Sequence, residues 1–195
     1  SIQRRLFVSD RPGVPIVRLY IPNKAQAALQ KNLPSQIKDW QQAYRLAADD
    51  ALQKIKVRHR GDNPINWAYA KKSWRTRSQK KNLIDGTRDW IYVIPQGQFL
   101  IENHLANRLA RQLDVLAPKS RMVELFINDV SHGLYEETER LDESFLRNNQ
   151  RMPVNIYKGE QASAERRLLS NRALFSNPDL WSKVAVFNQA AADDD

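Results

Sequence analysis

The sequence predicts an α+β fold in which a mainly antiparallel sheet carries packed helices. Several segments alternate apolar and polar residues and are bounded by Gly, Pro and Asn, as strands are. One helical segment with a leucine every four residues lies between two groups of these strands. The 195 residues, of which 42% are hydrophobic, suffice for one domain with a sizeable core. We therefore expect residues 1–195 to form a single domain.

The first half of the chain contains the clearest alternation. Residues 14–21 (VPIVRLYI) are β-rich and predict a strand. Residues 24–53 look helical, with an interruption at residues 33–35 where Pro34 suits the start of a second helix. Residues 54–60 (KIKVRHR) alternate strictly, which predicts a strand with its basic residues on one face and its apolar residues and a histidine on the other.

The middle of the chain predicts two more strands and the main helix. After a turn at residues 61–64, residues 71–77 (KKSWRTR) read as the returning strand, and residues 90–94 as a short apolar strand. Residues 98–114 predict a helix. Its apolar stripe, which we expect to pack on the sheet, consists of Ile101, Leu105, Leu109 and Leu113.

The later segments predict a hairpin and shorter elements. Residues 121–128 and 134–139 form two strands joined by residues 129–133. A short helix begins at Asp142, and residues 154–157 predict another short strand. Residues 160–195 are expected to form a helical segment, with a helix start at Asn177-Pro178-Asp179 and an apolar stripe beyond it.

The charge balance favours anionic partners. The net charge is +9 and the pI about 9.9, which fits nucleotide phosphates, nucleic acid, anionic membranes or acidic proteins. No run of 18 apolar residues predicts a membrane span, and no apolar signal segment follows the first residues, although the chain does not begin with Met. The absence of cysteine excludes disulfides and thiol catalysis but leaves the compartment undetermined.

Two charged groups are candidates for function. The basic cluster consists of Lys71, Lys72, Arg75, Arg77, Lys80 and Lys81, opposite Arg58 and Arg60. It is either a phosphate-contacting strand or a solvated edge that discourages aggregation. The acidic run consists of Glu136, Glu137, Glu139, Asp142 and Glu143. It offers either a buried carboxylate for a ligand amine or a lysine, or a solvated strand edge followed by helix-start acids.

Other site types find little support in the sequence. The three histidines fall in a strand, a helix and a turn, without the spacing of a metal site. No P-loop and no nucleophile elbow is present, which excludes P-loop nucleotidases and α/β-hydrolases.

Seven stretches, in order, resemble the CotH kinases, atypical protein kinases named for a spore-coat protein. The family's first signature is similar to Arg58-His59-Arg60-Gly61-Asp62 followed by residues 71–75 (KKSWR), and its helix resembles residues 103–113 (NHLANRLARQL). Five further stretches complete the series: residues 116–121, residues 126–128, Gly133-Leu134-Tyr135 with Glu139 and Asp142, residues 142–146, and residues 156–159. The resemblance covers about residues 14–159.

The resemblance implies a kinase that transfers the γ-phosphoryl group of ATP, with Mg²⁺, to Ser residues of spore-coat or cell-surface proteins. This chain would be mostly the nucleotide-covering lobe of a divergent protein-kinase-like fold. Lys72 is the first choice for the phosphate-pairing lysine, with Lys71 in reserve and Arg60 as a second contact. Glu139 would lie near the adenine at the hinge between lobes, with Asp142 just beyond.

The family's catalytic and magnesium-binding aspartates are expected in "HN" and "PWDxD" segments, and neither occurs in this sequence. We therefore assign no catalytic and no metal-binding residue here, and expect a fragment that is inactive alone. Glu102 before the helix Asn and Asn128-Asp129 in the hairpin turn also depart from the family pattern. The main alternative is a non-catalytic cell-surface module that binds an anionic partner through the basic cluster. Nucleic-acid binding is the third alternative.

Overall fold

The computed structural model describes residues 13–31, 33, 39–46, 51–61, 66–95, 101–152, 156–160 and 163–168. The chain divides into two compact units, residues 1–140 and 141–195, which are taken separately below.

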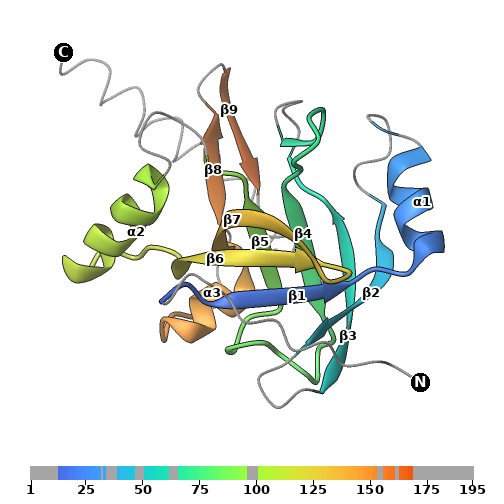
Figure 1. The fold of residues 1–195 in the computed structure, drawn as a ribbon. Coiled ribbons are helices and arrows are strands. Elements are labelled where there is room, and N and C mark those ends of the chain that lie inside the picture. The colour runs from blue at the N-terminus through green and yellow to red at the C-terminus, as the bar shows by residue number, and fades with distance from the viewer. Residues whose placement is uncertain are drawn as a thin grey trace. The chain divides into compact units, whose positions relative to one another are not determined.

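The first unit is a closed barrel of seven strands with two helices outside it (Figure 1). Around the barrel the strands follow the order β1-β2-β3-β4-β5-β7-β6, and all neighbours are antiparallel except the parallel pair β1 and β6. The elements are β1 (Ile16–Tyr20), α1 (Asn23–Lys31), β2 (Gln41–Leu46), β3 (Leu52–His59), β4 (Trp74–Ser78), β5 (Asp89–Val93), α2 (Glu102–Gln112), β6 (Ser120–Ile127) and β7 (Val130–Glu139).

Period-two alternation fills the barrel with side chains. In β3, Ile55, Val57 and His59 point inward and are almost completely buried, as the alternation predicts. Apolar residues from every strand join them in one cluster. It includes Val17, Leu19, Ala43, Trp74, Trp90, Tyr92, Val123, Leu125, Ile127 and Tyr135.

The β6–β7 hairpin confirms the predicted strand pair with a tighter turn than expected. Ile127 pairs with Val130, so the turn consists of only Asn128 and Asp129. Both residues have positive φ, 50° and 66°, as a two-residue type I′ turn requires. Asn and Asp tolerate this left-handed conformation better than other non-glycine residues, so the missing glycine does not prevent the turn.

The predicted helix over residues 24–53 is only partly correct. Its first half is α1, whose Ala25 and Leu29 are buried and which packs against β2. Residues 41–46 form β2 instead of a second helix, because this segment pairs with both β1 and β3 and completes the wall of the barrel. Pairing with partners distant in sequence overrides the local helix propensity of this stretch.

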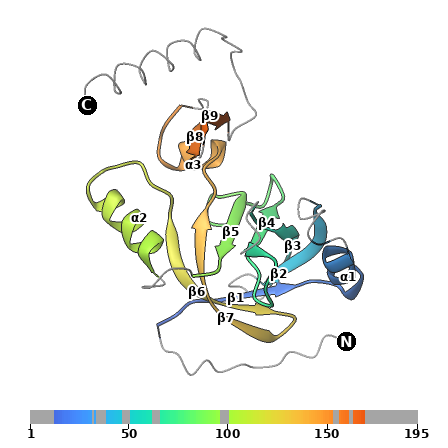
Figure 2. The same cartoon turned by 90° about the horizontal axis from the view of Figure 1, so that it is seen from above.

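The helix over residues 98–114 is confirmed as α2, but the face on which it packs was predicted wrongly. Leu105 is 52% exposed and Leu109 is 57% exposed, and α2 has no buried residue. The polar face of α2 lies toward β6 instead, and His104 hydrogen-bonds Ser120 at 2.9 Å. Figures 1 and 2 place α2 and α1 on opposite sides of the barrel.

The second unit contains α3 (Glu143–Asn148) and a hairpin of β8 (Tyr157–Glu160) and β9 (Ser163–Leu168). Asp142 caps α3, as predicted, because its carboxylate accepts a hydrogen bond from the backbone N–H of Ser144 at 2.8 Å. Residues 154 and 155 of the predicted strand over 154–157, and the helix predicted from Asn177, lie outside the described residues. Within the segment 160–195 that was predicted to be helical, residues 163–168 form β9. Within the described residues of both units, no helix is long and apolar enough to cross a membrane.

Candidate functional site

The two lysines before β4 lie at the end of the barrel formed by the end of β3 and the start of β4. Lys71 Nζ donates a hydrogen bond to the carbonyl oxygen of Leu134 in β7 at 2.7 Å. The same ammonium lies 4.6 Å from the centre of the Tyr135 ring, a cation–π distance. Burial lowers the pKa of Lys71. The two contacts, with the Leu134 carbonyl and the Tyr135 ring, hold the ammonium of Lys71 against β7.

Lys72 is held less completely. Its Nζ donates to the carbonyl oxygen of Tyr69 at 2.6 Å in an exposed hydrogen bond, and its own carbonyl accepts from the Tyr135 hydroxyl at 3.0 Å. An ammonium has three N–H donors, so this contact leaves donors for a ligand. Burial, and then the charge of Lys72, lower the pKa of the neighbouring His59 to about 4. The field of Lys72 therefore reaches into the barrel.

Arg60 joins this end of the barrel through its backbone. Its N–H donates to the carbonyl oxygen of Ser73 at 2.9 Å, directly after Lys71 and Lys72 in the chain. Burial raises the pKa of Glu136, and the charges of His104 and Arg60 partly offset that rise. The structure thus brings together three predicted site residues, Arg60, Lys71 and Lys72.

Of the other two predicted site residues, Glu139 lies at the far end of β7 and Asp142 belongs to the second unit. Glu139 ends β7 five residues beyond Leu134, which corresponds to about 17 Å along a strand. Its buried carboxylate accepts from the Thr87 hydroxyl at 2.9 Å and from the Lys119 backbone N–H at 3.3 Å. Asp142 belongs to the second unit, where its carboxylate caps α3.

The solvated-edge interpretation of the acidic run is wrong for its strand residues. Glu136, Glu137 and Glu139 are all buried. Inside the barrel, Glu137 pairs with Arg45 at 3.2 Å and accepts a hydrogen bond from the Tyr92 hydroxyl at 3.0 Å. Arg121 also contacts this carboxylate from β6.

Charge compensation explains how this polar group is tolerated in the core. Burial alone would lower the pKa of Arg45, but the neighbouring Tyr92 and Glu137 raise it. Burial and Glu137 raise the pKa of Tyr92, so its hydroxyl keeps its proton and donates. Sequence analysis missed Arg45 and Tyr92. The sequence offered one signal of a buried polar group. Glu137 lies on the same strand face as Tyr135, and this face points into the barrel.

The basic cluster is divided rather than continuous. Arg75 and Arg77 both bind Asp89 on β5, at 3.1 and 2.8 Å, and Arg77 lies 4.5 Å from the Trp40 ring. Burial alone would raise the pKa of Asp89, but hydrogen bonds and charge from these arginines lower it. Lys80 is exposed in the turn after β4. Arg75 and Arg77 therefore stabilise the barrel wall by pairing with Asp89. The sequence analysis did not identify Asp89 as a candidate residue.

No cluster of metal-ligating side chains is found among the described residues. No three His, Asp or Glu side chains in this part of the chain gather closely enough to hold a metal ion. Two of the buried carboxylates, Glu137 and Asp89, are paired with arginines.

Comparison with known families shows that residues 57–186 match the family described as CotH kinase protein. The match covers well over half of the chain and contains the end of β3, all of β4–β7, α2, Lys71 and Lys72. Comparison with curated proteins finds no match.

Proposed function

Since this chain belongs to the CotH kinase protein family, we propose that it contributes the nucleotide-covering part of a protein kinase. The complete enzyme would transfer the γ-phosphoryl group of ATP to Ser residues of coat or cell-surface proteins. The family match over residues 57–186 carries the proposal. The lysine-rich end of the barrel supports it, because it offers ammonium groups where phosphates could bind.

Lys72 is the residue that we propose to contact the ATP phosphates. Its ammonium has donors beyond its single exposed hydrogen bond, whereas Lys71 is held by both a carbonyl and an aromatic ring. Lys71 remains the reserve, and Arg60 is the proposed second contact. Glu139 and Asp142 are proposed to lie on the adenine side of the nucleotide.

We assign no magnesium ligand to this chain, because no three His, Asp or Glu side chains gather among the described residues. The family's "HN" and "PWDxD" segments, which carry the expected aspartates, do not occur in the printed sequence. We therefore expect the 195-residue chain alone not to phosphorylate a Ser substrate. A radiolabelled-ATP assay that compares it with a longer protein containing both segments tests this; robust transfer by the 195-residue chain would contradict it.

The role of Lys72 is tested by calorimetric titration of ATP and Mg²⁺ into the longer protein. A charge-assisted hydrogen bond contributes about 1.5–3 kcal/mol, so Lys72→Met should weaken ATP binding about 10- to 150-fold. The substitution keeps an unbranched stem, so folding should persist.

Lys80→Met is the matched control, because Lys80 is an exposed lysine beyond β4. It should leave ATP affinity nearly unchanged. Small and equal losses for the two variants would contradict the phosphate role of Lys72 and favour the non-catalytic interaction module.

A further inference from the structure

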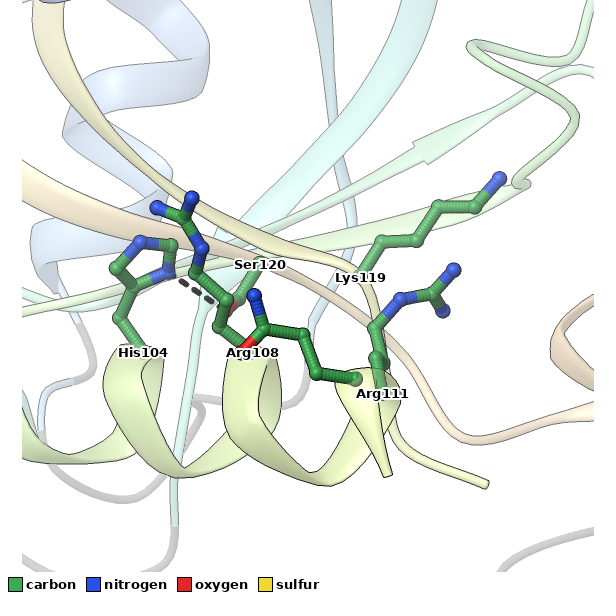
Figure 3. Close-up of a pocket in the computed structure, with 6 residues that line it drawn as sticks. His104, Arg108, Arg111, Lys119 and Ser120 are labelled. Carbon is green, nitrogen blue, oxygen red and sulfur yellow. Dashed lines mark hydrogen bonds between the residues drawn. The ribbon is translucent and has the colours of Figure 1, made fainter. Parts of the chain in front are cut away.

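A basic pocket lies between α2 and the start of β6 (Figure 3). Its volume is about 430 Å³. Its lining consists of His104, Arg108, Arg111 and Gln112 from α2 with Lys119 and Ser120 from the β6 side. Arg108 and Arg111 follow His104 at helical spacing, so these side chains share one face of α2. Figure 3 shows Arg108, Arg111 and Lys119 extending to the same side of the helix.

The pocket has an excess of positive charge. Within the described part of the chain, Arg108, Arg111 and Lys119 form no ion pair with a carboxylate. Two buried carboxylates lie near the pocket. Glu136 is under the influence of His104, and Glu139 accepts a hydrogen bond from the Lys119 backbone N–H at 3.3 Å. The three permanent cations of the pocket therefore outnumber these two carboxylates. His104 and the Ser120 hydroxyl, joined by a hydrogen bond of 2.9 Å, add further polar groups to the pocket lining.

A structural role explains only one of the cations. Arg111 lies in the last turn of α2 and donates from Nη1 to the carbonyl oxygen of Ala117 at 3.2 Å. A cation at this place stabilises a helix end through the macrodipole. Arg108 lies a turn earlier, and the side chain of Lys119 makes no hydrogen bond with another described residue. These two cations remain available to a ligand.

The pocket is separate from the lysine end of the barrel. Ser120 pairs with Thr138, whereas Leu134, which accepts the hydrogen bond of Lys71, pairs with Glu124. Four residues along the β6–β7 ladder correspond to about 13 Å. A phosphate bound by Lys72 would therefore not be the anion bound in this pocket.

We propose that the pocket between α2 and β6 binds the dianion of a phosphate monoester. The guanidinium of Arg108 can bind two phosphate oxygens at once, and Lys119 adds a point charge from the opposite side. The volume exceeds that of a phosphate group, so the rest of the ligand, a phosphorylated side chain or a sugar phosphate, has space beside Gln112.

The test is a titration of the whole ¹⁵N-labelled chain with inorganic phosphate near pH 7.5, where the dianion predominates. The backbone amides of Lys119 and Ser120 should shift saturably. Arg108→Gln and Lys119→Gln should each raise the Kd about tenfold, because each removes one charge-assisted contact. Arg151→Gln removes an exposed arginine from the second unit and should leave the Kd unchanged.

Two further arms identify the source of the phosphate. The Kd of a phosphoserine peptide is compared with that of the same peptide carrying unmodified serine, and with that of a sugar phosphate. Tighter binding of the phosphopeptide than of phosphate or the sugar phosphate assigns a phosphorylated protein. The reverse order assigns a small metabolite, and both results support the site.

Other outcomes would overturn the proposal. A non-saturable response at Lys119 and Ser120 would do so, as would pocket variants that bind phosphate like the unmodified chain. Lys72→Met is the second control: if it weakens phosphate binding as much as Arg108→Gln does, the anion binds at the lysine end instead. Circular dichroism of each variant confirms folding. Loss of ATP binding with intact phosphate binding would count against the proposed kinase function alone.

Discussion

His59 should make the stability of the barrel dependent on pH. Its side chain is 1% exposed, lies 4.3 Å from the Trp74 ring between centroids, and has no hydrogen-bond partner for either ring nitrogen among the described residues. Burial, then the charge of Lys72, lower its pKa from the ordinary 6.5 to about 4. The folded barrel therefore holds His59 in the neutral form.

The sign and size of the effect follow from this difference. Between pH 6.5 and 4 the unfolded chain binds a proton that the folded chain does not, so the free energy of unfolding falls as the pH falls. At about 1.4 kcal/mol per pKa unit, the full loss is about 3 kcal/mol, of which about 2 kcal/mol is already lost at pH 5. Above about pH 6.5 the stabilisation is fully present.

The measurement is urea unfolding followed by tryptophan fluorescence at pH 5, 6 and 7.5. His59→Phe keeps a ring beside Trp74 but cannot titrate, so its free energy of unfolding should fall about 2 kcal/mol less than that of the unmodified chain. At pH 7.5 the variant should be at least as stable, because it removes two unsatisfied buried nitrogens. His132→Gln is measured beside it, because burial and then Lys71 also lower the pKa of His132, so this histidine should contribute to the same pH dependence. Parallel pH curves for His59→Phe and the unmodified chain would refute the assignment of a neutral, buried His59.

Two stability predictions test the barrel and the helix outside it. Leu109→Ala should change the free energy of unfolding by less than about 0.5 kcal/mol because this side chain is exposed, whereas Leu125→Ala in the core should lower it by about 2–5 kcal/mol. Thermal unfolding of both variants measures the two losses. Equal losses would mean that Leu109 of α2 is buried. Glu137→Gln should destabilise by about 3–5 kcal/mol because it leaves Arg45 buried without its counter-charge. Denaturant unfolding measures this loss, and a change below about 1 kcal/mol would show that the pair is solvated.

Short-range signals determined much of the fold. The strict alternation over residues 54–60 predicted the buried face of β3, because period two places alternate side chains on opposite faces. The helix start at Asp142 followed from local capping chemistry, and the strands of the β6–β7 hairpin from their composition. The order of the motifs also predicted the family to which the chain belongs.

Tertiary contacts decided the rest, because apolar periodicity does not specify which partner covers an apolar face. Closure of the barrel depends on parallel pairing of β1 with β6, in which Ile16 meets Glu124, more than a hundred residues away. Residues 41–46 became a strand only through such partners. On α2 the leucine stripe predicted packing, but the bond between His104 and Ser120 turns the polar face toward β6.

The same distinction holds for the candidate site. The sequence by itself determined that Lys71 and Lys72 lie together before a strand, because they are neighbours in the chain. Only the tertiary structure decided that Lys71 is held by β7 while Lys72 retains donors, and that Glu137 is matched by Arg45 inside the barrel. Burial and charge pairing are set by strands that meet in space, so residue type and spacing alone cannot specify them.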